Sequence, residues 1–251
     1  MIALPGAFVR HVARELDRDE LPEPDLARAT DADREIGRLA WASRIVDEYR
    51  SVVVFGELFS LLAAVPAPLP ALATVQRLIA DELRHVQLCA KVVAWLGGLG
   101  GLNLELTGLE LPPSPRSPGA RALEVVSREL IVAETESLYA LRAYRDATTD
   151  PGVRAVMDTI VRDEVTHARA GHELAALLRS LLPADELAVL DPELEETMEQ
   201  DRAHIRRTHL DGAREGPGRP FAASVRREEM EAQIARGEAA RPRIMSSRPS
   251  G

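Results

Sequence analysis

Four long stretches of strong helix-forming residues, separated by proline and glycine breaks, constrain the fold of this chain more than any other feature. Ala, Leu, Arg and Glu dominate these stretches, and aromatic residues make up only 4% of the sequence. Apolar residues recur with helical spacing, which predicts long helices over residues 31–64, 71–96, 120–147 and 151–182. A shorter amphipathic helix is predicted over residues 7–18. The sequence therefore predicts an all-α protein.

The lengths of the connections indicate how the long helices are joined. The proline-rich breaker at residues 66–70 separates the first two helices. A short turn separates the last two, with Asp150 as the predicted N-cap and Pro151 in the first turn. Between the second and third helices lies a glycine- and proline-rich stretch, residues 99–119, which is too long for a tight turn. Two short connections around one long crossover predict two antiparallel helix pairs joined by a long link.

The remainder of the chain is predicted to add less regular structure. Residues 183–210 are expected to form one or two further helices. The stretch 212–251 is rich in Arg, Gly and Pro and is predicted to be a largely irregular tail, apart from a short helix near residues 224–235. We therefore expect a single helical domain over residues 1–211, with its core formed by the four long helices.

A duplicated motif interrupts the apolar faces of two of the predicted helices. The sequence Asp-Glu-Leu-Arg-His occupies residues 81–85, and Asp-Glu-Val-Thr-His occupies residues 163–167. In each copy the Glu and the His are three residues apart and project from the same helical face. Each pair replaces apolar residues in an otherwise continuous buried seam, where unpaired polar groups are costly. Metal ions would supply the missing partners.

Each of the other two long helices offers one carboxylate at an inward position. On the first helix Glu48 lies within the apolar stripe, whereas Glu57, nine residues later, points about 180° away. On the third helix the stripe favours Glu134 over Glu129 and Glu136, with Glu136 as the alternative. The predicted metal ligands are Glu48, Glu82, His85, Glu134, Glu164 and His167.

From about residue 41 to residue 182 the chain resembles the ferritin-like di-iron carboxylate superfamily, in particular its rubrerythrin-like bacterial branch. The resemblance rests on the duplicated motif, on the first-helix segment Glu-Tyr-Arg-Ser-Val at residues 48–52 and on Glu134-Thr135. It implies a ferritin-like four-helix bundle with a long crossover between its second and third helices. It also implies that one iron is bound by Glu48 and His85, the other by Glu134 and His167, and both by the bridging Glu82 and Glu164.

Two aspartates, each directly before a motif glutamate, are expected to support the ligands. A metal-bound histidine usually donates its second ring N–H to a carboxylate or carbonyl. One position before the glutamate, the side chain points about 100° sideways, toward the neighbouring helix. We therefore expect Asp81 to lie beside His167 and Asp163 to lie beside His85. The family resemblance implies the same crossed arrangement.

Imidazole and carboxylate ligands suit Fe(II) or Mn(II), so two iron ions are the expected cofactor, with manganese as the alternative. Six protein ligands on two ions leave positions where dioxygen or peroxide can bind. Three functions are compatible with such a site. They are oxidation or oxygenation of a small organic substrate, a ferroxidase or peroxide-scavenging activity of the rubrerythrin-like kind, and a non-catalytic helical interaction module. The first needs a mostly apolar cavity, for which Val52, Phe55, Leu138, Leu141 and Met157 are available.

Composition restricts the partners of the protein. The net charge of −9 and the lack of a basic cluster argue against binding to nucleic acid. The sequence contains no run of about 18 apolar residues, so we expect no membrane span. The single cysteine, Cys89, excludes a rubredoxin-type iron site, so electrons must come from an external donor. The apolar stretch at the start is too short for a signal peptide. We expect a cytoplasmic protein that forms a low-order oligomer such as a homodimer. We also expect the side chains of His204 and His209 to be solvated.

Overall fold

The computed structural model describes residues 20–240, and over this range the protein is all-α, as predicted. The described residues form no strand, although an isolated antiparallel bridge joins Arg214 to Val225. The helix predicted over residues 7–18 lies outside this range. Between residues 20 and 240, none of the helices has both the length and the apolar character that a membrane span requires.

The helix boundaries agree closely with the predicted ones. The predicted third helix is a continuous rod made of α4, a π-helical segment η2, and α5. The elements of the described residues are η1 (Leu26–Arg28), α2 (Asp31–Ala63), α3 (Leu69–Trp95), α4 (Pro118–Val125), η2 (Val126–Ala133), α5 (Glu134–Ala147), α6 (Pro151–Leu181), α7 (Ala184–Gly212), η3 (Arg219–Phe221) and α8 (Arg227–Ala240).

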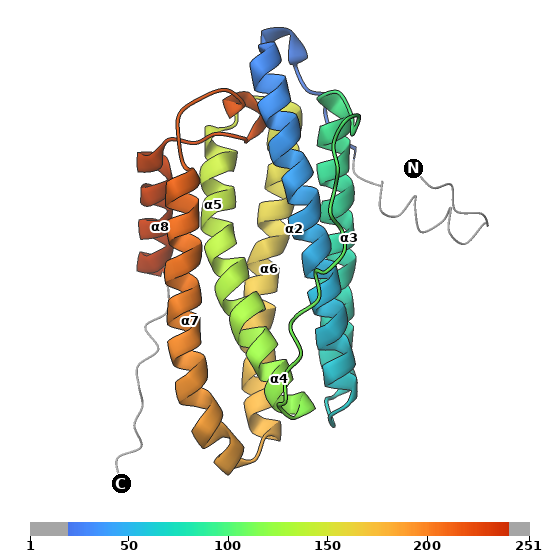
Figure 1. Ribbon diagram of the computed structural model, residues 1–251, viewed down its shortest axis with the longest axis vertical. Coiled ribbons are helices and arrows are strands. Elements are labelled where there is room, and N and C mark those ends of the chain that lie inside the picture. The colour runs from blue at the N-terminus through green and yellow to red at the C-terminus, as the bar shows by residue number, and fades with distance from the viewer. Residues whose placement is uncertain (1–19, 241–251) are drawn as a thin grey trace, which may run out of the picture.

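The long helices lie side by side along the longest axis of the molecule (Figure 1). α2 and α3 are antiparallel neighbours, and the connection over residues 96–117 then runs back along the length of the molecule. The α4–η2–α5 rod therefore runs parallel to α3, and α6 returns antiparallel to the rod. α7 packs along the outer side of the rod, and α8 packs against α5 and α7.

Local sequence signals explain where the helices begin and end. At the start of α2, Thr30 and Asp33 form a reciprocal capping box, in which the Thr30 hydroxyl accepts from the Asp33 N–H at 3.1 Å. At the start of α6, Asp150 accepts a hydrogen bond from the Val153 N–H at 2.9 Å, as an N-cap does. α3 ends where Gly97 adopts a φ of 123°, which residues with a Cβ rarely adopt.

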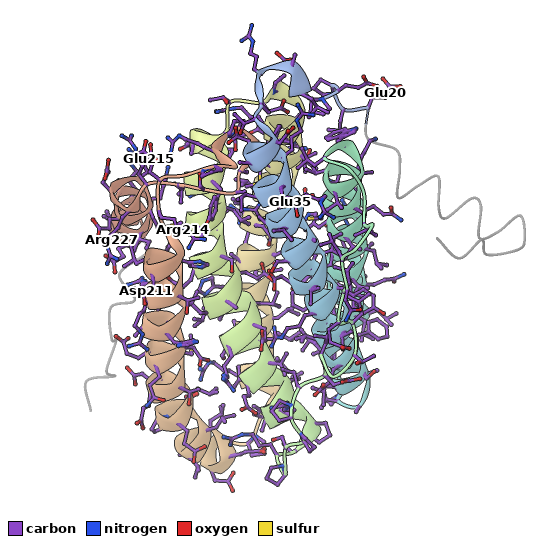
Figure 2. The ribbon with its side chains drawn as sticks, turned by 45° about the horizontal axis from the view of Figure 1, so that its top comes forward. Glu20, Glu35, Asp211, Arg214, Glu215 and Arg227 are labelled. Carbon is purple, nitrogen blue, oxygen red and sulfur yellow. The ribbon has the colours of Figure 1, made fainter. Side chains whose placement is uncertain are left out.

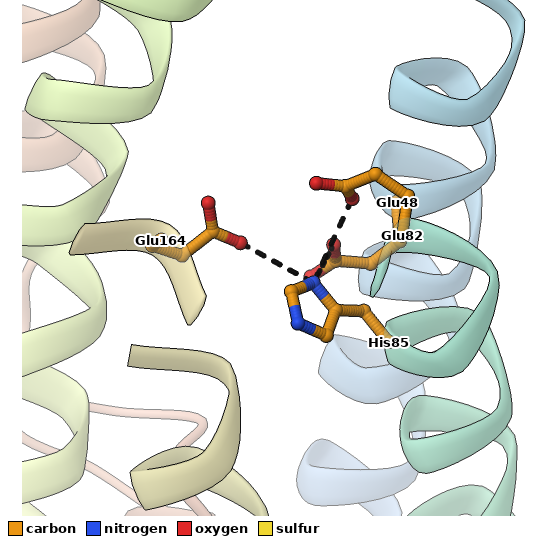
Figure 3. Close-up of side chains that lie close together, drawn as sticks. All are labelled: Glu48, Glu82, His85 and Glu164. Carbon is orange, nitrogen blue, oxygen red and sulfur yellow. Dashed lines mark ion pairs between the residues drawn. The ribbon is translucent and has the colours of Figure 1, made fainter. Parts of the chain in front are cut away.

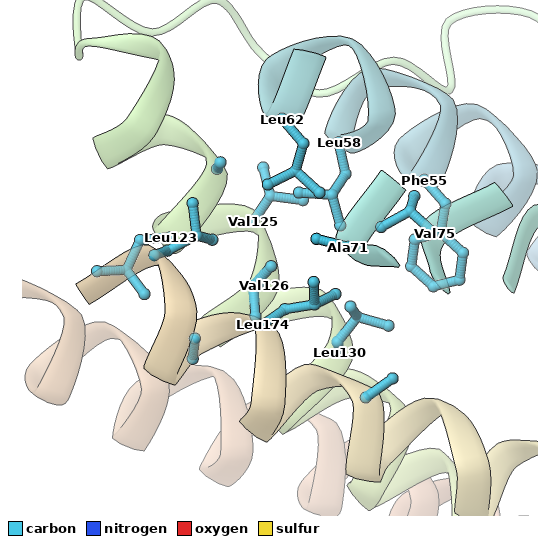
Figure 4. Packing of buried hydrophobic residues seen from close by; sticks show 14 of the residues in the cluster. Phe55, Leu58, Leu62, Ala71, Val75, Leu123, Val125, Val126, Leu130 and Leu174 are labelled. Carbon is cyan, nitrogen blue, oxygen red and sulfur yellow. The ribbon is translucent and has the colours of Figure 1, made fainter. Parts of the chain in front are cut away.

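A polar layer divides the core into two apolar halves. Figure 4 shows one half, where Leu58 and its neighbours pack between α2, α3, α4, η2 and α6. On α3, Leu78 belongs to this half and Leu88 to the other. On α6, Ala170 belongs to the half shown in Figure 4 and Ile160 to the other. The motif Glu and His residues lie between these positions and are all buried, so the interruption of the seams is a real layer in the structure.

The C-terminal part is packed more extensively than its composition indicates. Phe221 is fully buried, and its carbonyl oxygen accepts a hydrogen bond of 2.7 Å from the Trp41 indole N–H. Gly237 on α8 lies so close to α5 that a Cβ there would be 2.0 Å from the Tyr139 ring. The stretch from residue 212, predicted to be largely irregular, is therefore part of the packed molecule as far as residue 240. Its apolar residues are few, but Phe221, Val225 and Met230 are all used in the core.

The end of α7, the first residues after it and the start of α8 are polar and exposed to solvent, whereas the middle of the connection between these helices is buried. Figure 2 shows Asp211, Arg214, Glu215 and Arg227 in this region. Arg227 donates a hydrogen bond of 3.2 Å to the Leu210 carbonyl oxygen, one of the last carbonyls of α7. This bond satisfies one of the carbonyl oxygens at the end of α7, because no further helical turn supplies an N–H to donate to it.

Candidate metal centre

Six side chains from α2, α3, α5 and α6 meet in the polar layer. Each side chain offers one nitrogen or oxygen atom, and within each of two groups these atoms all lie within 4.8 Å of one another. In Figure 3 three of the side chains, from α2 and α3, face a fourth from α6. The groups share two glutamates and together contain every predicted ligand. The first consists of Glu48, Glu82, His85 and Glu164, and the second of Glu82, Glu134, Glu164 and His167.

The two shared carboxylates lie between the two imidazoles. Glu82 places Oε2 at 3.6 Å from His85 Nδ1 and Oε1 at 2.9 Å from His167 Nδ1. Glu164 places Oε1 at 3.3 Å from His85 Nδ1 and Oε2 at 3.2 Å from His167 Nδ1. Each carboxylate therefore presents one oxygen to each histidine. This placement is what a carboxylate shared by two ions requires.

The far nitrogens of the two histidines face the aspartates in the crossed arrangement. His85 Nε2 lies 3.2 Å from Asp163 Oδ2, within hydrogen-bond distance. His167 Nε2 lies 3.8 Å from Asp81 Oδ2, which is too long for a direct hydrogen bond. In both rings Nδ1 faces the cluster and Nε2 faces away from it. An aspartate at Nε2 favours the tautomer that leaves Nδ1 available as a ligand.

Two arginines on α3 hold the supporting aspartates. Arg84 donates a hydrogen bond of 2.6 Å to Asp163, and Arg77 donates bonds of 3.0 Å to Asp81. Burial alone would raise the pKa of Asp81, but His167 and Arg77 outweigh it and lower this pKa to about 2. Asp81 is therefore ionised at neutral pH and can stabilise a positive or proton-donating imidazole.

The π-helical segment η2 ends directly before Glu134, whose N–H donates to the Glu129 carbonyl five residues back. Of the three acidic candidates on this rod, only Glu134 reaches the cluster. Glu129 accepts two hydrogen bonds from Arg50, at 2.9 and 3.0 Å. Glu136 is buried as well, but it faces α7, where Arg206 donates two hydrogen bonds to it at 2.6 and 3.1 Å. The choice among them therefore depends on which neighbouring helix each one meets.

On α2 the helical phase separates the two candidate glutamates. The Glu48 side chain is only 12% exposed, and its Oε2 lies 3.4 Å from His85 Nδ1. Glu57 points elsewhere and forms an ion pair of 3.6 Å with Arg121. Nine residues correspond to two and a half helical turns, so the two carboxylates emerge on opposite sides.

The cluster has a shortage of hydrogen-bond partners that metal ions would relieve. Among the described residues, both oxygens of Glu82, the Oε2 of Glu164 and the Nδ1 of both motif histidines are buried without a hydrogen bond. Buried polar atoms left in this state are costly, and native proteins satisfy nearly all of them. Carboxylate oxygens and imidazole nitrogens are good ligands for divalent first-row metals. The residues present therefore fit a metal site.

Burial and mutual repulsion control the protonation of the cluster. Burial raises the pKa of Glu48 to about 8, although His85 opposes the rise. Burial, together with the negative charge of Glu164, raises the pKa of Glu134 well above its usual range. Burial acts in the same sense on Glu82 and Glu164, but the groups that face them outweigh it and lower the pKa of both. These groups are Glu134 and the two histidines for Glu164, and the two histidines for Glu82. Burial opposes charge on the histidines too, yet the carboxylates raise both of their pKa values.

A cavity of about 550 Å³ extends from the cluster between α2 and the α4–η2–α5 rod. Four of the cluster carboxylates form its inner end, and its lining includes the exposed residues Ser43 and Asp47, so it reaches the surface. α7 covers one side with Ile205 and His209. The space exists because small side chains face one another. They are Ala40, Ser43 and Ser51 on α2, Ala133 on η2, and Ser137 and Ala140 on α5.

The lining differs from the predicted one. Phe55 and Leu141 do line the cavity, but Val52, Leu138 and Met157 do not. Leu138 and Met157 are buried elsewhere in the molecule. The wall is also more polar than predicted, because arginines, serines and a tyrosine take part in it. The error arises because inward-facing apolar residues fill the core, whereas a cavity forms where residues are small.

Two polar residues that line the cavity were missed from the sequence. Arg44 precedes Glu48 by one helical turn, a spacing that places both on the same side of α2 and could have identified it. His209, predicted to be solvated, is only partly exposed, and its Nε2 is buried without a hydrogen-bond partner among the described residues. Burial lowers the pKa of His209 below its usual value. No signal on α7 alone indicates that this helix covers the cavity.

The geometry thus contains a buried cluster of Glu and His side chains at metal-binding distances, with a cavity that leads to it. Comparisons with protein-family models, with curated proteins and with solved structures find no match for this chain.

Proposed function

We propose that this protein is a ferritin-like di-iron carboxylate protein that activates dioxygen to oxidise or oxygenate a small organic substrate. One observation carries the proposal, namely two Glu-x-x-His segments whose buried, unpartnered atoms face each other across one polar layer. One further glutamate from α2 and one from α5 complete a set of four carboxylates and two imidazoles. Such a donor set suits Fe(II), with Mn(II) as the alternative.

The arrangement of the helices supports a ferritin-like bundle. α2 with α3, and the α4–η2–α5 rod with α6, are two antiparallel pairs, and the connection between the pairs runs the length of the molecule (Figure 1). In di-iron bundles of this kind, two helices each supply a Glu-x-x-His and the other two each supply a Glu. α3 and α6 carry the former, and α2 and α5 carry the latter.

In the proposed centre each iron has one glutamate and one histidine of its own. Iron bound there would supply electrons for the reduction of dioxygen. An external donor would have to return these electrons, because a chain with one cysteine cannot form a four-cysteine iron site. The residues that would hold one ion are Glu48 and His85, those that would hold the other are Glu134 and His167, and those that would bridge both are Glu82 and Glu164.

The residues around the centre have their own tasks in this proposal. Asp163 accepts a hydrogen bond from the Nε2–H of His85, so that Nδ1 is left to face the cluster. The two apolar halves of the core exclude water from the sides of the polar layer. The cavity approaches the layer from the side of α2 and α5, and its size suits a small molecule. A cavity of this kind supports an organic substrate more directly than a route for many iron ions.

Anaerobic titration with Fe(II), followed by sizing chromatography and oxygen-uptake measurements, tests the proposal. We expect about two irons per chain, a low-order oligomer, and oxygen uptake that increases when small molecules from cell extract are added. The variants His85→Ala and His167→Ala should each weaken iron binding, and Glu57→Gln should not, because Glu57 lies outside the cluster.

Each competing function has a different outcome. A large hollow assembly that takes up many irons per chain would support a ferroxidase. Peroxide consumption by the iron-loaded protein without an organic substrate would support peroxide scavenging. A chain that binds no metal would be left as a helical interaction module.

A further inference from the structure

Among the described residues, the cavity beside the cluster contains an arginine that no carboxylate pairs with. Arg44 lines the cavity from α2, and none of the ion pairs within 4.0 Å involves it. The other lining arginine, Arg50, is already bonded twice to Glu129. Asp47 also lines the cavity and its charge acts on Arg44 at longer range, but no ion pair within 4.0 Å joins the two side chains. Arg44 is thus a cation without a direct ionic partner in a confined space.

The guanidinium of Arg44 is held in place from three directions. Its Nη2 donates a hydrogen bond of 2.7 Å to the carbonyl oxygen of Ala222. Its central carbon lies 4.6 Å from the ring centre of Trp41 and 5.0 Å from that of Tyr144. Ala222 has a φ of 56°, a conformation that residues other than glycine rarely adopt, and this conformation helps to aim its carbonyl. The guanidinium is therefore oriented before any ligand arrives.

Two hydrogen-bonding atoms at this cavity have no partner among the described residues. One is Nη1 of Arg44, and the other is Nε2 of His209 on α7. Because burial lowers the pKa of His209, its imidazole is neutral at pH 7 and adds a polar group without a charge. A planar guanidinium with a free donor is well suited to a carboxylate, which can accept from it in a charge-assisted hydrogen bond.

We propose that the cavity binds a small organic carboxylate, with the acid group on Arg44 and the carbon skeleton along Leu141 toward the cluster. Arg44 and Glu48 are four residues apart on α2, which separates their Cα atoms by about 6 Å along the helix axis. The carbon skeleton must be at least about this long to reach the cluster. Benzoate and hexanoate have a suitable reach. The inference rests on the proposed function, because the inner end of the skeleton is the part that the metal centre would oxidise.

Isothermal titration calorimetry on the full chain, loaded anaerobically with Fe(II), tests the inference. The probes are benzoate and hexanoate, each compared with its neutral amide, benzamide or hexanamide. We expect each acid to bind at least about tenfold more tightly than its amide. The preference should disappear in Arg44→Gln. It should survive in part in Arg44→Lys, which keeps the charge but loses the planar pair of donors.

The double variant Arg50→Gln/Glu129→Gln is the matched control, since it changes the same wall without changing its net charge, and it should keep the preference. Circular dichroism checks that each variant is folded. Equal affinities for acid and amide, absence of binding by both acids, or a preference that persists in Arg44→Gln would overturn the inference. The iron content of each sample separates the two proposals. With two irons bound, such results overturn this inference alone, whereas a chain that binds no iron overturns the proposed function and the inference together.

Discussion

Loading the cluster with two divalent ions should release about four protons per chain at pH 7. In the metal-free protein Glu82 and Glu164 are ionised, because their pKa values are lowered. Glu48 and Glu134 hold protons, because burial raises their pKa values, to about 8 for Glu48. The two motif histidines each carry an extra proton, because the carboxylates raise their pKa values despite burial. All four groups must lose a proton to become ligands, so two doubly charged ions replace about four protons and the buried layer stays neutral.

The release can be measured with a pH indicator in weakly buffered solution, and independently by calorimetry in two buffers of different ionisation enthalpy. With two protons displaced per ion, the affinity for each ion should rise by about 100-fold per pH unit below pH 7. Above pH 8 the Glu48 carboxyl is already ionised, so the count should fall toward about three. The metal affinity rises with pH because the pKa values of the four groups are raised. Protons compete with the metal until the pH exceeds these pKa values.

Two variants test which groups release the protons. Glu134→Gln removes one group that holds a proton and should lower the release to about three protons. Glu57→Gln, outside the cluster, should leave the release unchanged. A release of fewer than about two protons in the native chain, or an unchanged count in Glu134→Gln, would refute the reasoning. The glutamates would then be ionised before metal arrives, and burial would not control their pKa values.

Three further predictions concern support and packing. Asp163→Asn should lower metal affinity by about 10–100-fold with the helix content intact, and Asp81→Asn should lower it less, because its distance to histidine is 3.8 Å instead of 3.2 Å. Equal effects in metal titrations would contradict this. Phe221→Ala should lower the free energy of unfolding in urea by about 3–5 kcal/mol, since the ring is fully buried, and a negligible loss would mean that the C-terminal part is not packed. Gly237→Ala should speed hydrogen exchange in α8 alone, because its Cβ would meet the Tyr139 ring, and unchanged exchange would argue against this contact.

The sequence by itself determined which face of each long helix points inward. The Glu and His pairs of α3 and α6 interrupt apolar seams. The seam residues one turn before and after each pair are buried, namely Leu78 and Cys89 on α3 and Ile160 and Gly171 on α6. Glu48 and Glu57 could be told apart in the same way, because nine residues place them on opposite sides of one helix. Helix ends at Thr30 and Asp150 are also local, since a cap depends on residues three positions away. All of these features depend on neighbours within a few residues, where the backbone geometry is known in advance.

Only the tertiary structure decided what each inward or outward residue meets. Glu134 and Glu136 are both buried, but one reaches the cluster and the other meets Arg206, which is 70 residues away in the chain. The cavity and its arginine Arg44 depend on the distance between α2 and α5, and the burial of His209 depends on where α7 lies. Helical periodicity gives directions around one axis and contains no information about the separation of two axes. That separation is set by the packing of side chains from distant segments, which is why the residues of the cluster could be predicted and the lining of the cavity could not.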